Sequence, residues 1–156
     1  MIALRVFHPS DLGTLHEIDQ ICFPAGIAYS KSELRYYLQH PKSLAVVAEE
    51  DGAISGFCIG QSYLLEGKPV GHIITIDVLP AARRQGIGKQ LFSDIEKRLQ
   101  QAGALFIQLE VAIDNLSAQA FYDDMGFERI GRIPGYYNGK VDALVMEKSF
   151  INVEEP

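Results

Sequence analysis

The amino-acid sequence predicts an α/β domain in which a single sheet carries helices on both faces. Segments with alternating apolar residues are interspersed with segments whose apolar residues recur at helical spacing. Their order along the chain is strand, two helices, three strands, helix, strand, helix and two strands, which is typical of a sheet covered on both sides. Because 47% of the 156 residues are hydrophobic, the chain has enough apolar material for one substantial core.

The bulk properties set limits on location and partners. We expect a single domain over residues 1–151 and a polar tail over 152–156. No apolar run approaches the ~20 residues of a membrane span, and no signal peptide is evident, so we expect a cytoplasmic protein without membrane association. The formal charge of −6 argues against nucleic-acid binding. Four scattered histidines lack metal-ligand spacing, and the two cysteines suggest reduced thiols rather than a disulfide framework.

The first part of the chain predicts one strand and two helices. Residues 3–7 alternate weakly as a strand, and Pro9 suits the first turn of a helix that ends before Phe23. Ser30, with Glu33 three residues later, forms a capping box that begins the second helix.

The loop between these two helices, residues 23–29, contains more apolar bulk than an exposed loop requires. One interpretation is a loop that covers the core. The other is that Phe23, Pro24 and Tyr29 form one wall of a substrate groove.

The middle of the chain predicts three strands. Residues 44–49 and 53–63 flank Asp51-Gly52, a dipeptide that favours the positive φ angles of a tight hairpin turn. A second turn at residues 66–69 leads into a strand over 70–79.

The last third predicts two helices and three strands. A long helix follows the glycines of residues 86–88, with Ile87, Leu91, Phe92, Ile95 and Leu99 at helical spacing, and ends near Gly103. A half-buried strand covers 105–111. A short helix over 115–125 follows, in which Phe121 and Met125 are spaced to face a core. Two strands, over 127–133 and 141–150, are joined by a loop at 135–139.

The turn before the long helix has the composition of an anion-binding site. It reads Arg83-Arg84-Gln85-Gly86-Ile87-Gly88-Lys89. The glycines allow a ligand to approach the backbone, and the first turn of the helix leaves N–H groups unpaired. Three cationic side chains at the positive end of a helix dipole favour an anionic ligand. The endings of a P-loop and of a Rossmann motif are absent, and a basic turn that simply caps a helix remains the alternative.

This turn resembles a known signature. The string R-R-Q-G-I-G is similar to the pyrophosphate-binding motif of the GNAT superfamily of acetyl-CoA-dependent N-acetyltransferases. L-E-V-A-I-D-N-L-S-A-Q-A-F-Y-D-D-M-G-F over 109–127 and Y-Y-N-G-K-V-D-A-L-V-M over 136–146 resemble its protein N-terminal acetyltransferase branch, which includes the ribosomal-protein alanine acetyltransferases. The resemblance covers residue 23 almost to the C-terminus. It implies the GNAT fold, with a central mixed, mostly antiparallel twisted sheet, and acetyl-CoA as acetyl donor.

The resemblance also implies two catalytic residues. Glu110 projects from the face opposite the aliphatic set of its strand, and the matching family residue is the general base, direct or through a water. The matching tyrosine, here Tyr122, is the general acid for the leaving thiolate. An exposed strand carboxylate and a tyrosine packed beside Phe121 are the structural alternatives.

Further residues are expected to hold the two substrates. By resemblance, Asn115 contacts the pantetheine arm, although it can equally cap a helix. We expect the backbone of Ile76-Asp77-Val78 to pair with the pantetheine amides, with an N–H near Val78 as oxyanion donor. On the acceptor side we expect Tyr136 and Tyr137 as the second groove wall, and His72 either assisting Glu110 through water or as a structural residue.

We expect a protein or peptide N-terminus as the acceptor, with a ribosomal protein as one candidate. An α-amine with a pKa of about 7.7–8.0 requires about 1 kcal/mol for deprotonation at pH 7, whereas a lysine amine near ~10.4 requires roughly 4.6 kcal/mol. The chain departs from the family pattern at Ala112 and Asp114, which weakens an alanine-specific assignment. A small-molecule or lysine acetyltransferase and a non-catalytic acyl-CoA-binding module remain alternatives, and the enzyme is expected as a monomer or homodimer.

Overall fold

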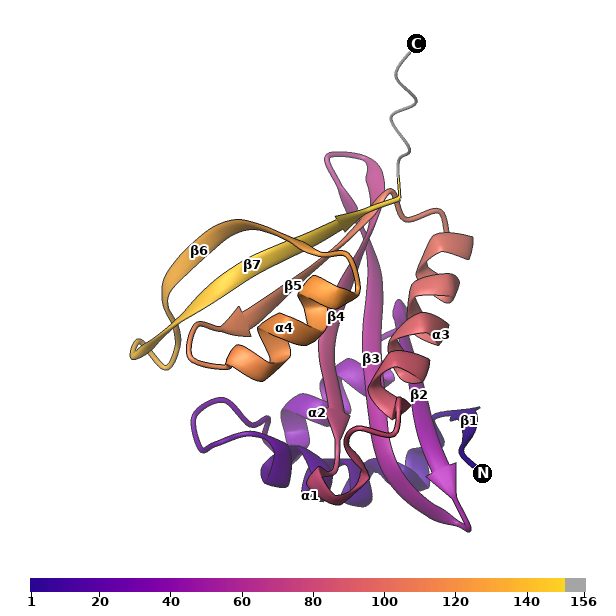
Figure 1. The fold of residues 1–156 in the computed structure, drawn as a ribbon. Helices are drawn as coiled ribbons and strands as arrows, with labels where there is room; N and C mark the ends of the chain where they lie inside the picture. Colours follow the sequence, from indigo (N-terminus) through magenta and orange to yellow (C-terminus); the bar gives the residue numbers. More distant parts are fainter. Residues whose placement is uncertain (151–156) are drawn as a thin grey trace.

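One sheet of seven strands and four helices on its two faces make up residues 1–150, the part of the chain that the computed structural model describes (Figure 1). The predicted tail and residue 151 lie outside the described residues. The strands are β1 (Ala3–Val6), β2 (Ser43–Glu50), β3 (Ala53–Leu65), β4 (Lys68–Val78), β5 (Phe106–Ala112), β6 (Glu128–Tyr137) and β7 (Val141–Ser149). The helices are α1 (Leu12–Cys22), α2 (Lys31–Gln39), α3 (Ile87–Gln101) and α4 (Leu116–Asp124).

The strand order is β1-β2-β3-β4-β5-β7-β6, and every neighbouring pair is antiparallel except β4 and β5. Helices α3 and α4 lie in front of the sheet in Figure 1, and α1 and α2 lie behind it. The structure therefore confirms the predicted order of elements, the mixed and mostly antiparallel sheet, and the helices on both faces.

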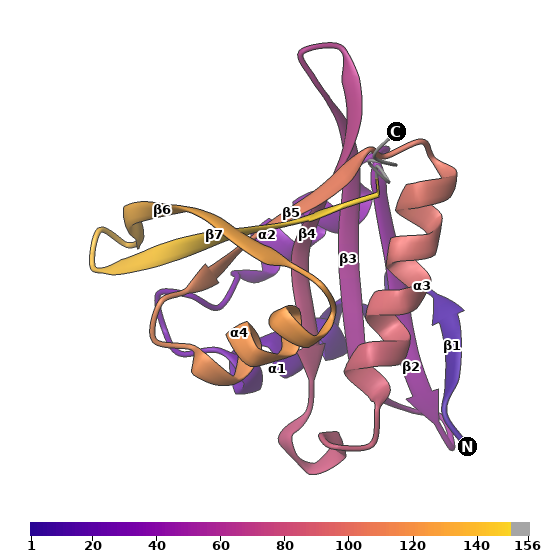
Figure 2. The ribbon, with the colours of Figure 1, turned by 45° about the horizontal axis from the view of Figure 1, so that its top comes forward.

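The parallel pair β4–β5 is unusually short. Its paired residues are only Gly71 with Ile107 and His72 with Gln108. Beyond them β4 continues beside β3 as far as Val78, whereas β5 follows β7, so the two strands diverge and the sheet opens like a V (Figures 1 and 2). The edges of β4 and β5 that face each other across this gap are available to a ligand.

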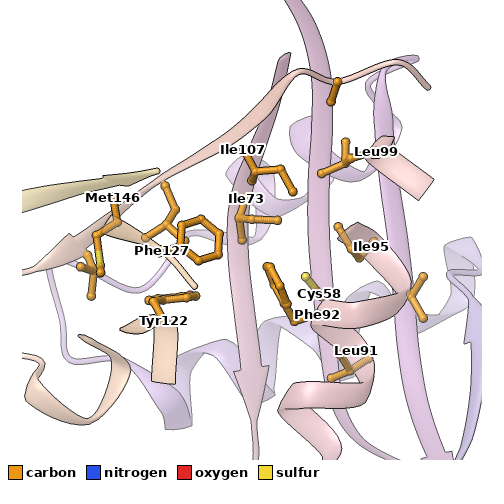
Figure 3. Packing of buried hydrophobic residues seen from close by; sticks show 14 of the residues in the cluster. Cys58, Ile73, Leu91, Phe92, Ile95, Leu99, Ile107, Tyr122, Phe127 and Met146 are labelled. Carbon is orange, nitrogen blue, oxygen red and sulfur yellow. The ribbon is translucent and has the colours of Figure 1, made fainter. Parts of the chain in front are cut away.

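Each face of the sheet has its own core. The apolar stripe of α3 that helical spacing predicted is fully buried against the sheet (Figure 3). Glycines in the strands make this close packing possible, since a Cβ on Gly60 would lie 2.8 Å from Cγ2 of Ile95. On the other face, Leu15 and Leu34 from α1 and α2 pack against a cluster that includes Phe57.

Several local predictions agree with the structure and others need correction. The capping box of Ser30 and Glu33 is formed, and Asp51 and Gly52 have the positive φ angles expected for their hairpin turn. The predicted loop at 135–139 is wrong, because β6 continues to Tyr137 and the turn occupies residues 138–140. The Gly135 N–H donates to Asp142 Oδ1 at 2.8 Å, which keeps the irregular end of β6 beside β7.

Smaller boundary differences concern the first helix and the central hairpin. The helix predicted from Pro9 begins as a 3₁₀ turn, Pro9–Asp11, before α1. The β3–β4 hairpin extends to Leu65 and Lys68, and it projects beyond the sheet in Figure 2. Among the described residues, none of the helices has the length and apolarity needed to cross a membrane.

Candidate active site

A cavity of about 990 Å³ lies in the gap between β4 and β5. Its walls come from the diverging strands, the N-terminus of α3, one side of α4 and the loop before α2. The volume is at the upper end of the range typical of small-molecule sites. The cavity in this gap is therefore the main candidate for a substrate-binding site.

Most of the residues singled out from the sequence meet at this cavity. Those that line it are Phe23, Pro24, Tyr29, Ile76, Val78, Arg83, Arg84, Gly86, Ile87, Gly88, Lys89, Glu110, Asn115, Tyr122 and Tyr137. Four predicted site residues do not line it, namely His72, Asp77, Gln85 and Tyr136. The Asp77 side chain is buried, its exposed fraction being 1%, and it hydrogen-bonds Thr75.

The N-terminus of α3 supplies the anion-binding end of the cavity. Gly86 is the N-cap with a left-handed φ of 77°, and no side chain among the described residues caps this helix end. The first turn contains no acidic residue, and Gly88 and Lys89 line the cavity directly. Free N–H groups, the helix dipole and the nearby Arg84 together favour a phosphate group at this position.

The exposed edge of β4 presents backbone groups beside this anion site. The Leu79 N–H donates to Ser55 O on the β3 side at 2.8 Å. Because backbone groups alternate in direction along a strand, the N–H and C=O of Val78 point toward the gap. The Val78 carbonyl is held by Arg83 Nε at 3.0 Å and by the Cys22 thiol at 3.4 Å. The Val78 N–H thereby points into the gap, where it can donate to a ligand.

A carboxylate–imidazole pair closes the other side of the gap. His72 Nε2 lies 2.6 Å from Glu110 Oε2, and the two side chains are 26% and 21% exposed. The short parallel pairing explains the contact, since His72 on β4 is opposite Gln108 and Glu110 is two residues further on the same face of β5. The sequence suggested assistance through a water, whereas the structure places the two groups in direct contact.

Tyrosines surround this pair. The Tyr29 hydroxyl donates to Ile74 O at 3.3 Å, and the rings of Tyr136 and Tyr137 meet edge to face with centroids 4.9 Å apart. Burial raises the pKa of Tyr29 and of Tyr137, so both phenols are neutral donors at neutral pH. This side of the gap is therefore aromatic, with hydrogen-bond donors and one carboxylate.

The two predicted walls of the acceptor groove touch each other. A Cβ on Gly26, in the loop before α2, would lie 2.7 Å from Nδ2 of Asn138 in the β6–β7 turn. A smaller hollow beneath this contact is lined by Ile27, Asp114 and Tyr137, which also line the main cavity. The loop before α2 and the β6–β7 turn consequently enclose this hollow together.

Two predicted site residues of the α4 region, Asn115 and Tyr122, line the cavity. Tyr122 is buried and packs edge to face against Phe121 and Phe127. Burial raises the pKa of Tyr122, so the phenol stays protonated at neutral pH and keeps a proton that it can donate. Asn115 lines the cavity and also caps α4, its Oδ1 accepting from Ala118 N at 3.2 Å.

Some lining residues were not predicted. The spacing of Phe121 indicated a core position, yet its ring lies 3.5 Å from the place of a Cβ on Gly88 and contributes to the cavity wall. The divergence of β4 and β5 was also not predicted, because neither strand contains a residue that marks where pairing stops. Among the described residues, no cluster of three or more metal-ligating side chains occurs.

The fold and the site together define a class of protein. A sheet split at its parallel pair, with an anion-binding helix end on one side and a carboxylate–imidazole pair on the other, is suited to transferring a group from an anionic donor to an acceptor. The chain belongs to the acetyltransferase (GNAT) family, whose model matches residues 12–127.

Similar proteins support the assignment. An uncharacterized N-acetyltransferase of Methanocaldococcus jannaschii is 31% identical over 154 residues, covering 98% of this chain and 95% of that protein. N-alpha-acetyltransferase 20 of Dictyostelium discoideum is 28% identical over 153 residues, covering 96% and 86%. The crystal structure of the ribosomal-protein-S18-alanine N-acetyltransferase from Escherichia coli shares the fold, with a TM-score of 0.82 and 24% identity over 100% of this chain and 99% of that one.

These comparisons confirm the predicted GNAT family and fold. The protein is an acetyl-CoA-dependent N-acetyltransferase, and acetyl-CoA is its acetyl donor.

Proposed function

We propose that this enzyme acetylates the N-terminal α-amine of a protein or peptide by direct transfer from acetyl-CoA. The observation that carries the proposal is the pairing of Glu110 with His72 on the side of the gap opposite the anion-binding end of α3. Two substrates that enter from opposite sides then meet between β4 and β5, and no acetylated enzyme intermediate is required.

The residues at the gap match the steps of the reaction. In our proposal Glu110, supported by His72, accepts the proton of the acceptor amine, and the neutral nitrogen attacks the thioester carbonyl. The Val78 N–H stabilises the oxyanion, and Tyr122 donates a proton to the departing thiolate. Acetyl-CoA supplies the activated acetyl group, while Arg83, Arg84 and Lys89 with the α3 N-terminus hold its diphosphate.

A peptide end fits the acceptor side better than a lysine within a folded surface. The two walls approach each other at Gly26 and Asn138, so a slender extended segment suits the groove. An α-amine also needs about 3.6 kcal/mol less for deprotonation at pH 7 than a lysine amine. The name of the Dictyostelium relative specifies N-alpha acetylation, and the Escherichia coli neighbour makes a ribosomal protein one acceptor worth testing.

We also infer a cytoplasmic enzyme that works as a monomer or homodimer. Cys22 and Cys58 are free, and Cys58 is fully buried, which agrees with a reducing compartment.

A peptide library separates the possible acceptors. Purified enzyme is incubated with acetyl-CoA and peptides that vary in their first residues, and the products are located by mass spectrometry. We expect acetylation at α-amines, whereas N-terminally blocked peptides with internal lysines remain unmodified. Higher kcat/KM on lysines or on free polyamines than on any peptide α-amine would overturn the proposal.

A further inference from the structure

Two buried aspartates meet behind the cavity and take no part in the chemistry described above. Asp19 lies on α1 and Asp77 on β4, with exposed fractions of 0% and 1%. Both carboxyl groups sit between α1 and the sheet, within hydrogen-bonding reach of each other. An acidic pair in such a position needs an explanation, since two unpaired buried charges are strongly unfavourable.

Only two of the four carboxyl oxygens of this pair accept a hydrogen bond from the residues that the structure describes. Asp19 Oδ2 accepts from the Tyr29 N–H at 2.7 Å, and Asp77 Oδ1 accepts from the Thr75 hydroxyl at 2.5 Å. Asp19 Oδ1 and Asp77 Oδ2 are buried and find no donor among the residues that the structure describes. A single proton on either of these two oxygens satisfies both, because a carboxylic acid donates to a carboxylate.

The pair connects the segments that bind the two substrates. Through Tyr29, Asp19 holds the end of the loop that forms one acceptor wall. Asp77 stands between Ile76 and Val78, both of which line the donor side of the gap. Cys22, one turn after Asp19 on α1, donates to the Val78 carbonyl and adds a second link between the same helix and strand.

We propose that Asp19 and Asp77 share one proton and act as positioning residues, holding the acetyl-CoA-binding edge of β4 and the acceptor loop 23–29 in a fixed relation. The proposal rests on the assignment of the cavity to acetyl-CoA. It gives the Asp77 side chain a role in addition to the backbone pairing with the pantetheine that the sequence suggested.

The electrostatic surroundings are consistent with a shared proton. Burial, followed by the contact with Asp19, raises the pKa of Asp77 well above its usual value, and burial also raises the pKa of Asp19. The other titratable or charged groups that face the pair are His16, Cys22, Tyr29, Glu33, Cys58, Arg83 and Tyr122.

A raised pKa gives the pair a defined pH dependence. The folded protein retains a proton that the unfolded chain releases near pH ~4. The contribution to stability is complete below that pH and is lost as the pH rises through the folded-state pKa. Once the proton leaves, repulsion separates α1 from β4 and weakens binding of acetyl-CoA.

The test compares Asp77→Asn with the wild type in thermal melting and in calorimetry with acetyl-CoA, from about pH 5 to about pH 9. The asparagine amide donates to Asp19 Oδ1 and does not titrate. At high pH we expect the Tm of the wild type to fall and its Kd for acetyl-CoA to rise roughly tenfold. The Asp77→Asn protein should bind acetyl-CoA as the wild type does at low pH, and it should show neither change at high pH. Asp77→Ala should weaken binding at every pH, and Asp51→Asn, in an exposed turn, serves as control.

Two results would overturn the proposal. One is an Asp77→Asn protein whose Tm and acetyl-CoA Kd follow pH as those of the wild type do. The other is a normal acetyl-CoA Kd in a folded Asp77→Ala protein. Neither measurement uses an acceptor, so a failure here is distinguishable from a wrong assignment of the acceptor amine.

Discussion

In our proposal, the two sides of the gap between β4 and β5, a donor side and an acceptor side, recognise their substrates by different means. The donor side relies on backbone groups, namely the N-terminus of α3 and the edge of β4 at Val78. The acceptor side relies on side chains, chiefly Glu110, His72 and the surrounding tyrosines. Backbone recognition needs only a short glycine-containing motif, and it can therefore be shared by enzymes with different acceptors. Specificity for the acceptor depends on residues that can change without disturbing the donor site.

The largest expected effect comes from the acceptor side. Glu110→Gln removes the proton acceptor while it keeps the shape of the side chain, so kcat should fall by about 10³-fold with little change in the acetyl-CoA Kd. Steady-state kinetics and calorimetry measure the two quantities. Glu147→Gln, at a carboxylate that accepts from Gln108, is the matched control and should retain activity. An unchanged kcat in Glu110→Gln would show that Glu110 is not the proton acceptor.

Tyr122→Phe tests the proton donor on the opposite side. The ring contacts with Phe121 and Phe127 are kept, whereas the hydroxyl is lost, so kcat should fall by about 10²-fold at unchanged Tm. An acetyl donor with a more acidic leaving thiol should recover much of this loss. If kcat falls equally with acetyl-CoA and with the donor that has the more acidic thiol, Tyr122 has a packing role and does not donate the proton.

Lys89→Gln should separate donor binding from stability. The change removes one cation from the anion site, which should raise the acetyl-CoA KM by about tenfold. Because a cation at a helix N-terminus is unfavourable by about 0.3–1 kcal/mol, the same variant should be slightly more stable in thermal melting. Lys97→Gln, at an exposed position of the same helix, should alter neither property. A Lys89→Gln protein with a normal acetyl-CoA KM would contradict the location of the diphosphate.

The smallest expected effect concerns the acceptor wall. Tyr137→Phe removes one neutral donor from the groove, so the KM for a peptide should rise by about threefold while the acetyl-CoA KM stays constant. Steady-state titration of each substrate distinguishes the two. A change in the acetyl-CoA KM alone would indicate that Tyr137 contacts acetyl-CoA rather than the peptide.

The position of the helix N-terminus at the cavity was easier to predict from the sequence than the contacts of Glu110, for physical reasons. Glycines and cations around Gly86 mark a helix N-terminus through local conformation and charge, which a single segment specifies. The direct contact of His72 with Glu110 depends on where β4 stops pairing with β5. This depends on the tertiary path of the two strands, which includes an irregularity in β4 between Ile73 and Thr75. Asp19 and Asp77 are 58 positions apart in the sequence, and no local sequence pattern indicates that their side chains meet.

The loop around Tyr136 shows a further limit of prediction. Two glycines at 135 and 139 indicated a connecting loop. Instead, Gly135 lies within β6, where the pairing with β7 is irregular, and the strand continues to Tyr137. Tertiary pairing with β7 outweighs the local preference of glycine for a turn. The element order, the buried face of α3 and the hairpin at Asp51 were specified locally and were predicted correctly.

A crystal structure with a conjugate of CoA and a peptide N-terminus tests the central claim most directly, because one molecule must occupy both sides of the gap. We predict the diphosphate against residues 83–89, the linking carbonyl at the Val78 N–H, and the peptide nitrogen near Glu110 with its chain between residues 23–29 and Tyr137. A conjugate bound without entering the gap between β4 and β5, or with its nitrogen on the side away from Glu110, would contradict the account.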